Sequence, residues 1–213
     1  MTANAAPQNW ALQVNNMLKE CTVMEGFAAY ASGQAGDTYF ADLDQTVVVC
    51  GNSPKPHDLD AARRMNYMVQ QIPVPGGCVV FQPHDFLILH LSERADDFFE
   101  KWSQVLIAFL REKGLDAYSL PGPLGLHHDI IVRDRGISYK VGTHSQGPIG
   151  LNRPYMCATA LSFHVKESHI KRISILSPVK PPRGLSTFNI TIDEIKALFL
   201  RFMNDTYNEK ISC

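Results

Sequence analysis

The sequence predicts an α+β fold in which helices pack on one central sheet that is mixed and largely antiparallel. Two features indicate this class. Short β-branched and apolar runs, bounded by glycine, proline or polar residues, cluster in the middle of the chain. Three amphipathic patterns with helical spacing lie near its start, middle and end. Because 213 residues suit one domain, we expect residues 1–213 to form a single domain.

The composition of the chain argues against some classes of binding partner. Apolar residues make up 45% of the chain and charged residues 19%, which is enough for a real core. The formal net charge of −1 gives no electrostatic support for a nucleic-acid partner. No apolar run reaches the roughly 18 residues of a membrane span, so no membrane partner is expected. The first residues resemble neither a signal peptide nor a presequence, which predicts a cytoplasmic protein, or a mitochondrial one if a presequence has been removed.

Five cysteines are spread along the chain without a CxxC motif or zinc-like spacing. Their number is odd and most lie in apolar runs. We therefore expect free thiols in a reducing compartment rather than disulfides. No HxH or HExxH motif is present either, and no metal site is expected.

The first half of the chain predicts helices and strands in alternation. Trp10, Val14 and Met17 have helical spacing, which predicts a helix from about residue 9 to 31. The run TVVVCG at 46–51 predicts a buried strand, and Asp58 can cap a helix over 59–70. A Pro-Gly-Gly turn then leads into two strands that we expect to form a hairpin, at 78–81 and 86–92.

The second half predicts the strongest helix, over about 94–113, which Gly114 ends. Strands follow at 116–120 and on both sides of the turn at 133–136, and the glycine- and proline-rich stretch 145–154 predicts a mobile loop. Another strand is expected within 156–165. The prolines of VKPPRGL exclude a helix or central strand there. A capping box at Thr191 to Glu194 opens the last helix, over about 192–207.

The order of these segments resembles the lipoate–protein ligase and octanoyltransferase family, within the biotin/lipoate protein ligase superfamily. The matching segments are VVVCG at 47–51, PGGCVVF at 75–81, DIIVRDRGISYKVG at 129–142, CATALSFHV at 157–165 and PPRGL at 181–185. The resemblance covers about residues 10–207. It implies a biotin/lipoate ligase-like fold and an enzyme, either an acyltransferase or a ligase. The reaction would move a lipoyl- or octanoyl-like acyl group to a lysine of a carrier domain.

The same resemblance implies the partners and cofactors. The ligand would be a small-molecule acyl group, and the protein partner a small acyl-carrier or lipoyl-domain protein. ATP would be needed by a ligase, whereas a transferase would take its acyl group from a lipoate or octanoyl carrier.

Three departures from the family pattern keep other functions open. Val74 and Pro75 stand where the family has an arginine, the loop SPVKPPRGL lacks a cysteine, and Cys157 replaces a histidine. One alternative is a non-catalytic family member that serves as a binding or assembly module, with Phe81, Phe86 and Phe163 filling the cleft. Another is an enzyme of the same fold with altered chemistry.

Lys140 is the first candidate catalytic residue. Its ammonium could stabilise negative charge on an acyl carbonyl or an adenylate phosphate. The alternative is a solvated lysine on a strand edge. Gly76 and Gly77 are candidate substrate-binding residues, because backbone N–H groups in a glycine turn can approach a carboxylate or phosphate closely. The alternative is an ordinary tight turn.

Cys157 is the second candidate catalytic residue, as a nucleophile whose thiolate Lys140 would favour. The alternative is a buried thiol that packs as a small hydrophobe. His127, His128 and His144 could converge as a general base or a metal pair. The remaining predicted substrate-binding residues flank these candidates: Cys78, Phe81, Gly142, Thr143 and His144.

Overall fold

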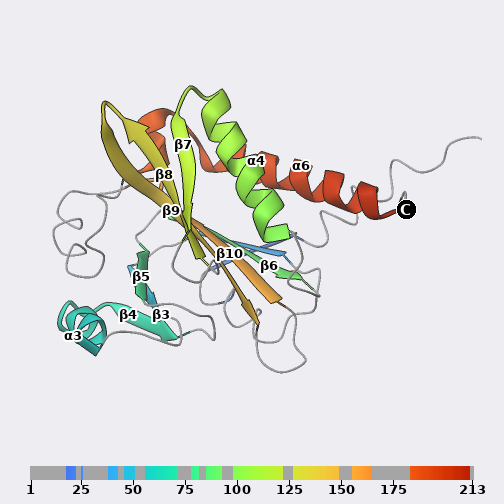
Figure 1. Ribbon diagram of the computed structural model, residues 1–213. Helices are drawn as coiled ribbons and strands as arrows, with labels where there is room; N and C mark the ends of the chain where they lie inside the picture. Colours follow the sequence, from blue (N-terminus) through green and yellow to red (C-terminus); the bar gives the residue numbers. More distant parts are fainter. Residues whose placement is uncertain are drawn as a thin grey trace, which may run out of the picture.

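The computed structural model describes residues 18–22, 25, 38–42, 46–50, 56–71, 78–81, 85–92, 98–121, 127–148, 155–164 and 183–211. Within these ranges it confirms the α+β class (Figure 1). Helices α4 and α6 cover one face of a large sheet, and a small sheet with helix α3 lies on its other side. No helix in these ranges is long and apolar enough to cross a membrane.

The large sheet contains seven strands in the order β1-β2-β6-β10-β9-β8-β7. Only β1 and β2 pair in parallel, and every other pair is antiparallel, as the sequence predicts. The strands are β1 (Leu18–Thr22), β2 (Thr38–Asp42), β6 (Phe86–Ser92), β7 (Asp116–Pro121), β8 (His127–Asp134), β9 (Ile137–Pro148) and β10 (Tyr155–Leu161).

The prediction of one sheet is wrong, because three strands form a separate small sheet. Strand β3 (Val47–Cys50) pairs in parallel with β4 (Met68–Gln71) and antiparallel with β5 (Cys78–Phe81). The hairpin expected between β5 and β6 therefore does not form. Each strand instead pairs with a partner distant in sequence, which no local turn signal reveals.

Two helical predictions are also corrected. Leu18–Thr22 is a strand rather than part of a helix, because it pairs along its length with β2; residues 9–17 lie outside the described ranges. Helix α3 spans Pro56–Arg64 and ends early. Asn66 has a φ of 55°, a left-handed conformation that asparagine tolerates after a helix, and β4 follows at once.

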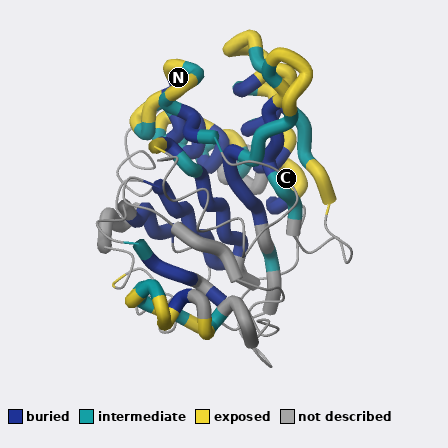
Figure 2. The backbone as a smooth tube through the Cα atoms, turned by 90° about the vertical axis from the view of Figure 1, so that its left-hand side faces the viewer, coloured by how far each residue is buried: buried dark blue, intermediate teal, exposed yellow. Residues whose placement is uncertain are grey.

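Helices α4 (Phe98–Glu112) and α6 (Ile192–Ile211) bury a hydrophobic cluster against the large sheet, here called the helix-side cluster. Trp102 and Phe199 are at most 1% exposed, and their rings meet edge to face at 4.9 Å. Phe109 is only partly buried. Figure 2 shows the buried backbone running through the centre of the molecule. Burying each such side chain contributes about 1.5–3 kcal/mol.

The helix boundaries follow local signals. Gly114 has a φ of 82° and, as predicted, ends α4. Thr191 and Glu194 form the expected capping box: the Thr191 N–H donates to Glu194 Oε2 at 2.9 Å, and the Glu194 N–H donates to Thr191 Oγ1 at 3.2 Å. These contacts satisfy backbone donors that the first turn of α6 leaves unpaired.

The predicted pair of strands around the turn at 133–136 is confirmed as the β8–β9 hairpin. Arg135 and Gly136 have positive φ values of 49° and 80°, typical of a two-residue hairpin turn. Strand β9 continues to Pro148, so residues 145–148 of the expected mobile loop are strand, and 149–154 lie outside the described ranges. Strand β10 ends at Leu161, four residues before the predicted limit.

The expectation that all cysteines are free is wrong for Cys50. This residue takes part in a disulfide bond, whereas Cys157 is free. Cys78 lies directly opposite Cys50 in the β3–β5 pairing. The spacing of the cysteines, which contains no CxxC motif, did not reveal the bond.

His144 lies in a chain of buried polar contacts on the helix side of the large sheet. Trp102 Nε1 donates to Thr159 Oγ1 at 2.9 Å, and that hydroxyl contacts His144 Nδ1 at 2.8 Å. Burial, followed by the charge of neighbouring His128, lowers the pKa of His144 from 6.5 to about 3. The ring is therefore neutral at physiological pH.

Gly184 lies where the backbone approaches the end of β10 too closely for a side chain. A Cβ there would meet the carbonyl oxygen of Phe163 at 2.1 Å. We expect Gly184→Ala to lower the free energy of unfolding by about 1–3 kcal/mol through overpacking, measured by urea denaturation. As a contrast, Gly136→Ala meets open space but keeps a positive φ, and should cost about 1 kcal/mol. A Gly184→Ala protein as stable as the parent would contradict the expected clash.

His144 should make the protein less stable in mild acid. Its pKa is lower in the folded state, so the unfolded chain binds more protons between about pH 3 and 6.5. The stability is complete above pH 6.5 and is lost as the pH falls below that value. Between pH 7 and pH 5 this residue should remove about 2 kcal/mol of unfolding free energy.

His144→Gln should abolish that part of the pH dependence in urea titrations at the two pH values. The matched control is His164→Gln, which changes an exposed histidine and should leave the dependence intact. An unchanged pH dependence in His144→Gln would show that the ring titrates normally in the fold.

Candidate functional site

A β-bulge in β9 determines where Lys140 points. Ile130 of β8 pairs with Gly142, whereas the next residue, Ile131, pairs with Lys140, so Val141 is an extra residue on β9. Ile130 and Val141 both belong to the helix-side cluster. Because neighbouring side chains on a strand alternate, Lys140 points to the opposite face of the large sheet, here called the Lys140 face.

Lys140 forms an ion pair with Asp129 of β8. Its Nζ lies 2.6 Å from Asp129 Oδ1, and both side chains are 23% exposed. Asp129 and Ile131 are two residues apart on β8 and therefore share the Lys140 face. The alternative of a freely solvated lysine does not hold, because the ammonium is partly buried and has a fixed partner. An ammonium carries further N–H donors that an oxygen of a ligand could accept.

Small and apolar side chains lie on the same face beside Lys140. On β10, Ala158 and Ala160 alternate with Cys157 and Leu161, which belong to the helix-side cluster. Ala160 pairs with Thr143 of β9, and all three of Ala158, Ala160 and Thr143 are buried. The Lys140 face thus combines one charged pair with an apolar floor made of small residues.

The bulge divides the predicted site residues of β9 between two faces. Without it, Lys140, Gly142 and His144 would share a face, as their even spacing suggests. With Val141 inserted, Thr143 takes the Lys140 face, and His144 points to the helices, where its ring lies 5.1 Å from that of Phe99. The predicted substrate-binding role of His144 therefore does not fit its position, which is 1% exposed.

Gly142 is explained by packing. A Cβ at this position would meet the Ala160 carbonyl oxygen at 2.5 Å and a Leu161 methyl group at 2.7 Å. Strands β9 and β10 can therefore keep their pairing at the bulge only if residue 142 lacks a side chain. This reason is sufficient without a ligand.

The structure does not bring Cys157 to Lys140. Cys157 pairs with Gln146, six residues along β9 from Lys140, which corresponds to roughly 20 Å. It is also 6% exposed and belongs to the helix-side cluster, on the opposite face. An ammonium favours a thiolate only within about 4–6 Å. The expected activation of Cys157 by Lys140 is therefore wrong, and the thiol packs as a small hydrophobe.

The other predicted ligand-binding residues belong to the chain around β5. Cys78 and Phe81 are the first and last residues of this strand and pair with Cys50 and Val47. Gly76 and Gly77 lie outside the described residues. Phe86 and Phe163, expected to fill the cleft in a non-catalytic protein, lie in the helix-side cluster instead.

Sequence reasoning missed two residues of this region. Asp129 opens the DIIV run, and alternation along β8 could have placed it on the face of Lys140, given the hairpin turn. Arg183 is the second of these residues. Its backbone N–H donates to the Lys140 carbonyl oxygen at 3.0 Å, a contact between residues distant in sequence that no local pattern predicts.

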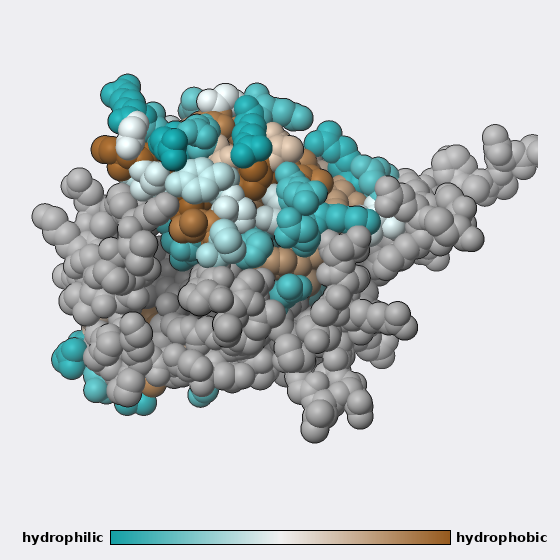
Figure 3. All heavy atoms as spheres, viewed as in Figure 1, coloured by the Kyte–Doolittle hydropathy of each residue, from teal (hydrophilic) through white to brown (hydrophobic). Residues whose placement is uncertain are grey.

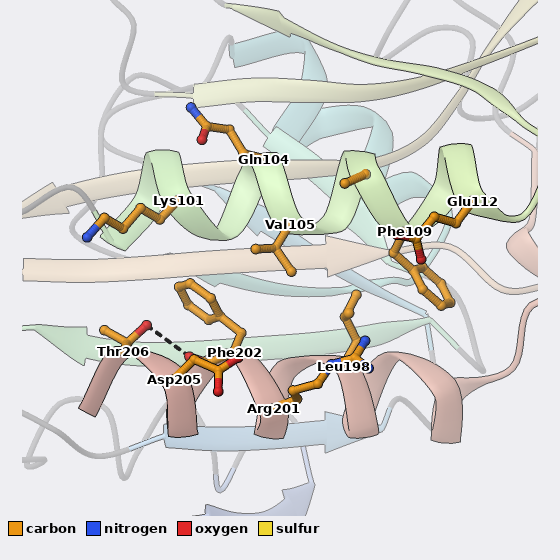
Figure 4. Close-up of a pocket in the computed structure, with 11 residues that line it drawn as sticks. Lys101, Gln104, Val105, Phe109, Glu112, Leu198, Arg201, Phe202, Asp205 and Thr206 are labelled. Carbon is orange, nitrogen blue, oxygen red and sulfur yellow. Dashed lines mark hydrogen bonds between the residues drawn. The ribbon is translucent and has the colours of Figure 1, made fainter. Parts of the chain in front are cut away.

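A groove of about 460 Å³ lies between α4 and α6, away from the residues of the Lys140 face (Figure 4). Its apolar side chains point toward one another from the two helices: Val105, Phe109, Leu198 and Phe202. Acidic and basic residues both line it. Figure 3 shows hydrophobic side chains lying between hydrophilic ones on this side of the molecule. This balance of charges selects no particular ligand.

Comparison with solved structures places the fold among lipoate–protein ligases. The chain matches a bipartite lipoate protein ligase of Thermoplasma acidophilum, solved in a study that included its E2 lipoyl domain, with a TM-score of 0.61 and 20% identity, over 90% of this chain and 82% of that one. A lipoate–protein ligase A bound with ATP matches with a TM-score of 0.60 and 20% identity, over 90% and 85%.

A third structure, LipL1 of P. falciparum in complex with lipoate, matches with a TM-score of 0.61 and 11% identity, over 91% of this chain and 62% of that one. No family model and no curated protein matches the sequence. The likeness therefore lies in the arrangement of helices and strands over nine-tenths of the chain. This protein has the lipoate–protein ligase fold, in a divergent sequence.

Proposed function

We propose that the chain binds a lipoyl- or octanoyl-like acyl group on the Lys140 face and transfers it to a lysine amine of a small carrier domain. The observation that carries the proposal is the Lys140–Asp129 pair, held partly buried beside a bulge of β9 in a lipoate–protein ligase fold. A cation in such a place can interact with an oxygen atom that gains negative charge during acyl transfer.

Each side chain has a distinct role in this proposal. The Lys140 ammonium donates to the acyl carbonyl oxygen, or to a phosphate oxygen of an activated acyl group. Asp129 holds the ammonium in place between turnovers. Ala158 and Ala160 offer an apolar floor, which suits a medium-length acyl chain better than a polar substrate.

Activation of the acyl group by ATP suits the described residues better than a thioester on Cys157. A nucleophilic thiol must reach the same carbonyl carbon as the cation that stabilises the oxygen, and Cys157 lies roughly 20 Å along the sheet on the other face. Lys140 fits an ATP-derived phosphate group, because an ammonium binds phosphate as a point charge. One structural relative was solved with ATP and another with lipoate.

A second candidate function is a binding or assembly module without catalysis. Asp129 already neutralises Lys140 at 2.6 Å, so a ligand must compete with a carboxylate for the ammonium. In this case the protein would bind an acyl group or a carrier domain, but would not exchange pyrophosphate with ATP.

Lys140→Met should abolish the reaction while keeping the fold. We expect lipoate- and ATP-dependent pyrophosphate exchange to fall by about 10²–10³-fold, the usual effect of removing one donor to a developing charge. The unfolding free energy should change by about 1 kcal/mol or less, because the ion pair is partly exposed. The matched control is Lys113→Met, which removes an exposed lysine paired with Glu194.

Pyrophosphate exchange and calorimetry together separate the two candidate functions. Lipoate binding by calorimetry, without pyrophosphate exchange in the unmodified protein, would favour the binding module. Equal exchange rates in the unmodified and Lys140→Met proteins would contradict the role of Lys140.

A further inference from the structure

The segment that precedes α6 is attached to β9 at the bulge. Strand β10 ends at Leu161, opposite Gly142. Beyond this point the Ser162 N–H donates to the Val141 carbonyl oxygen at 2.9 Å, and the Arg183 N–H donates to the Lys140 carbonyl oxygen at 3.0 Å. Two segments distant in sequence therefore bind the consecutive carbonyl groups of the bulge.

The side chain of Arg183 strengthens this attachment. Its Nη1 donates to Asp134 Oδ2 at 2.6 Å. The guanidinium lies 4.7 Å from the ring centres of both Tyr139 and Phe188, and its Nε donates to Thr187 Oγ1 at 3.2 Å. A planar guanidinium is suited to such combined stacking and hydrogen bonding, whereas a lysine ammonium is not.

These contacts connect three elements near Lys140. Asp134 ends β8, Tyr139 precedes Lys140 on β9, and Phe188 ends the short helix η1 (Leu185–Phe188) that leads to α6. In Figure 1 this segment passes beside the β8–β9 hairpin. We call Arg183, Asp134, Tyr139 and Phe188 the Arg183 latch.

We infer that Arg183 is a positioning residue for Lys140. This inference rests on the proposed function of the Lys140 face. The latch holds the Tyr139 ring and the Lys140 carbonyl group at the same time, and so fixes the backbone on both sides of the Lys140 side chain. A bulge alone leaves an unpaired residue and a locally disrupted ladder, so its geometry depends on contacts from outside the sheet.

The attachment of Arg183 matters because the proposed reaction requires Lys140 to be placed precisely. A displacement of about 1 Å can cost about 10²-fold in rate when a reacting group must be aligned. Arg183 touches neither Asp129 nor Lys140 Nζ in the described contacts, so it acts through the backbone. The latch therefore sets the direction of Lys140 without taking part in acyl chemistry.

The test uses the full chain and two variants, Arg183→Ala and Arg183→Lys. The first readout is the labelling rate of each lysine by acetic anhydride at limiting concentration, resolved by peptide mass spectrometry. Lys113 serves as the internal reference. The second readout is lipoate affinity by calorimetry. The control variant is Arg63→Ala, which removes an exposed arginine of α3 that pairs with Asp60.

We expect Lys140 labelling, relative to Lys113, to rise severalfold in both Arg183 variants, because the lysine is no longer held against Asp129. Lipoate affinity should fall about tenfold or more in both variants, within the loss expected from misalignment. Arg63→Ala should change neither readout. Lys140 labelling and lipoate affinity equal to those of the unmodified protein in Arg183→Lys would overturn the latch. They would show that a positive charge at residue 183 is sufficient to position Lys140.

Unchanged Lys140 labelling in Arg183→Ala would also overturn the inference, even if Lys140→Met abolishes activity. Raised labelling in a protein whose unmodified form binds no lipoate would support the latch while contradicting the proposed function. If Arg183→Ala fails to fold, Asp134→Asn gives the same readouts, since it weakens the latch and leaves the arginine in place.

Discussion

The pairing of β8 with β9 around the extra residue Val141 is the constraint on which the candidate site depends. The tight hairpin turn at Arg135 and Gly136 sets the register from one end. The insertion then reverses the alternation of side chains in the rest of β9. Lys140 therefore shares a face with Asp129 and Thr143, while His144 joins the buried contacts of Trp102 and Thr159. One residue thus separates a charged, partly exposed surface from the hydrophobic core.

The close packing around the bulge restricts which residues can occupy the neighbouring positions. Gly142 lies where β9 approaches β10 closely, and Gly184 lies where the segment before α6 approaches the residues after β10; neither leaves room for a Cβ. Arg183 then holds that segment against the bulge. The glycines permit the close approach, and the arginine determines its geometry. In this part of the molecule the same close contacts therefore determine both the packing and the geometry of the candidate site.

The sequence predicted the features that neighbouring residues determine. Gly114, the Thr191–Glu194 capping box and the β8–β9 turn each rest on a few consecutive residues, and all three were found. Strand partners were harder, because β5 pairs with β3 rather than with adjacent β6, and Leu18–Thr22 becomes a strand only through β2. The resemblance identified the fold, and it singled out Lys140 as a candidate residue. It could not assign Cys157 and His144 to a face, because that depends on register and on the bulge.

The distribution of these constraints explains how the fold can persist at 11–20% identity to known lipoate ligases. Most of the burial lies on the helix side, where the cluster around Trp102 and Phe199 needs apolar side chains of suitable size more than particular residues. The Lys140 face also buries Ile131, Leu87 and Leu89, so only its partly exposed positions, such as Lys140 and Asp129, can change at little cost in stability. A divergent chain can therefore keep the architecture while losing the arginine and loop cysteine of the family pattern. Under the proposed function, acyl transfer would require only a cation, a carboxylate that orients it, and a backbone held firmly enough to align both.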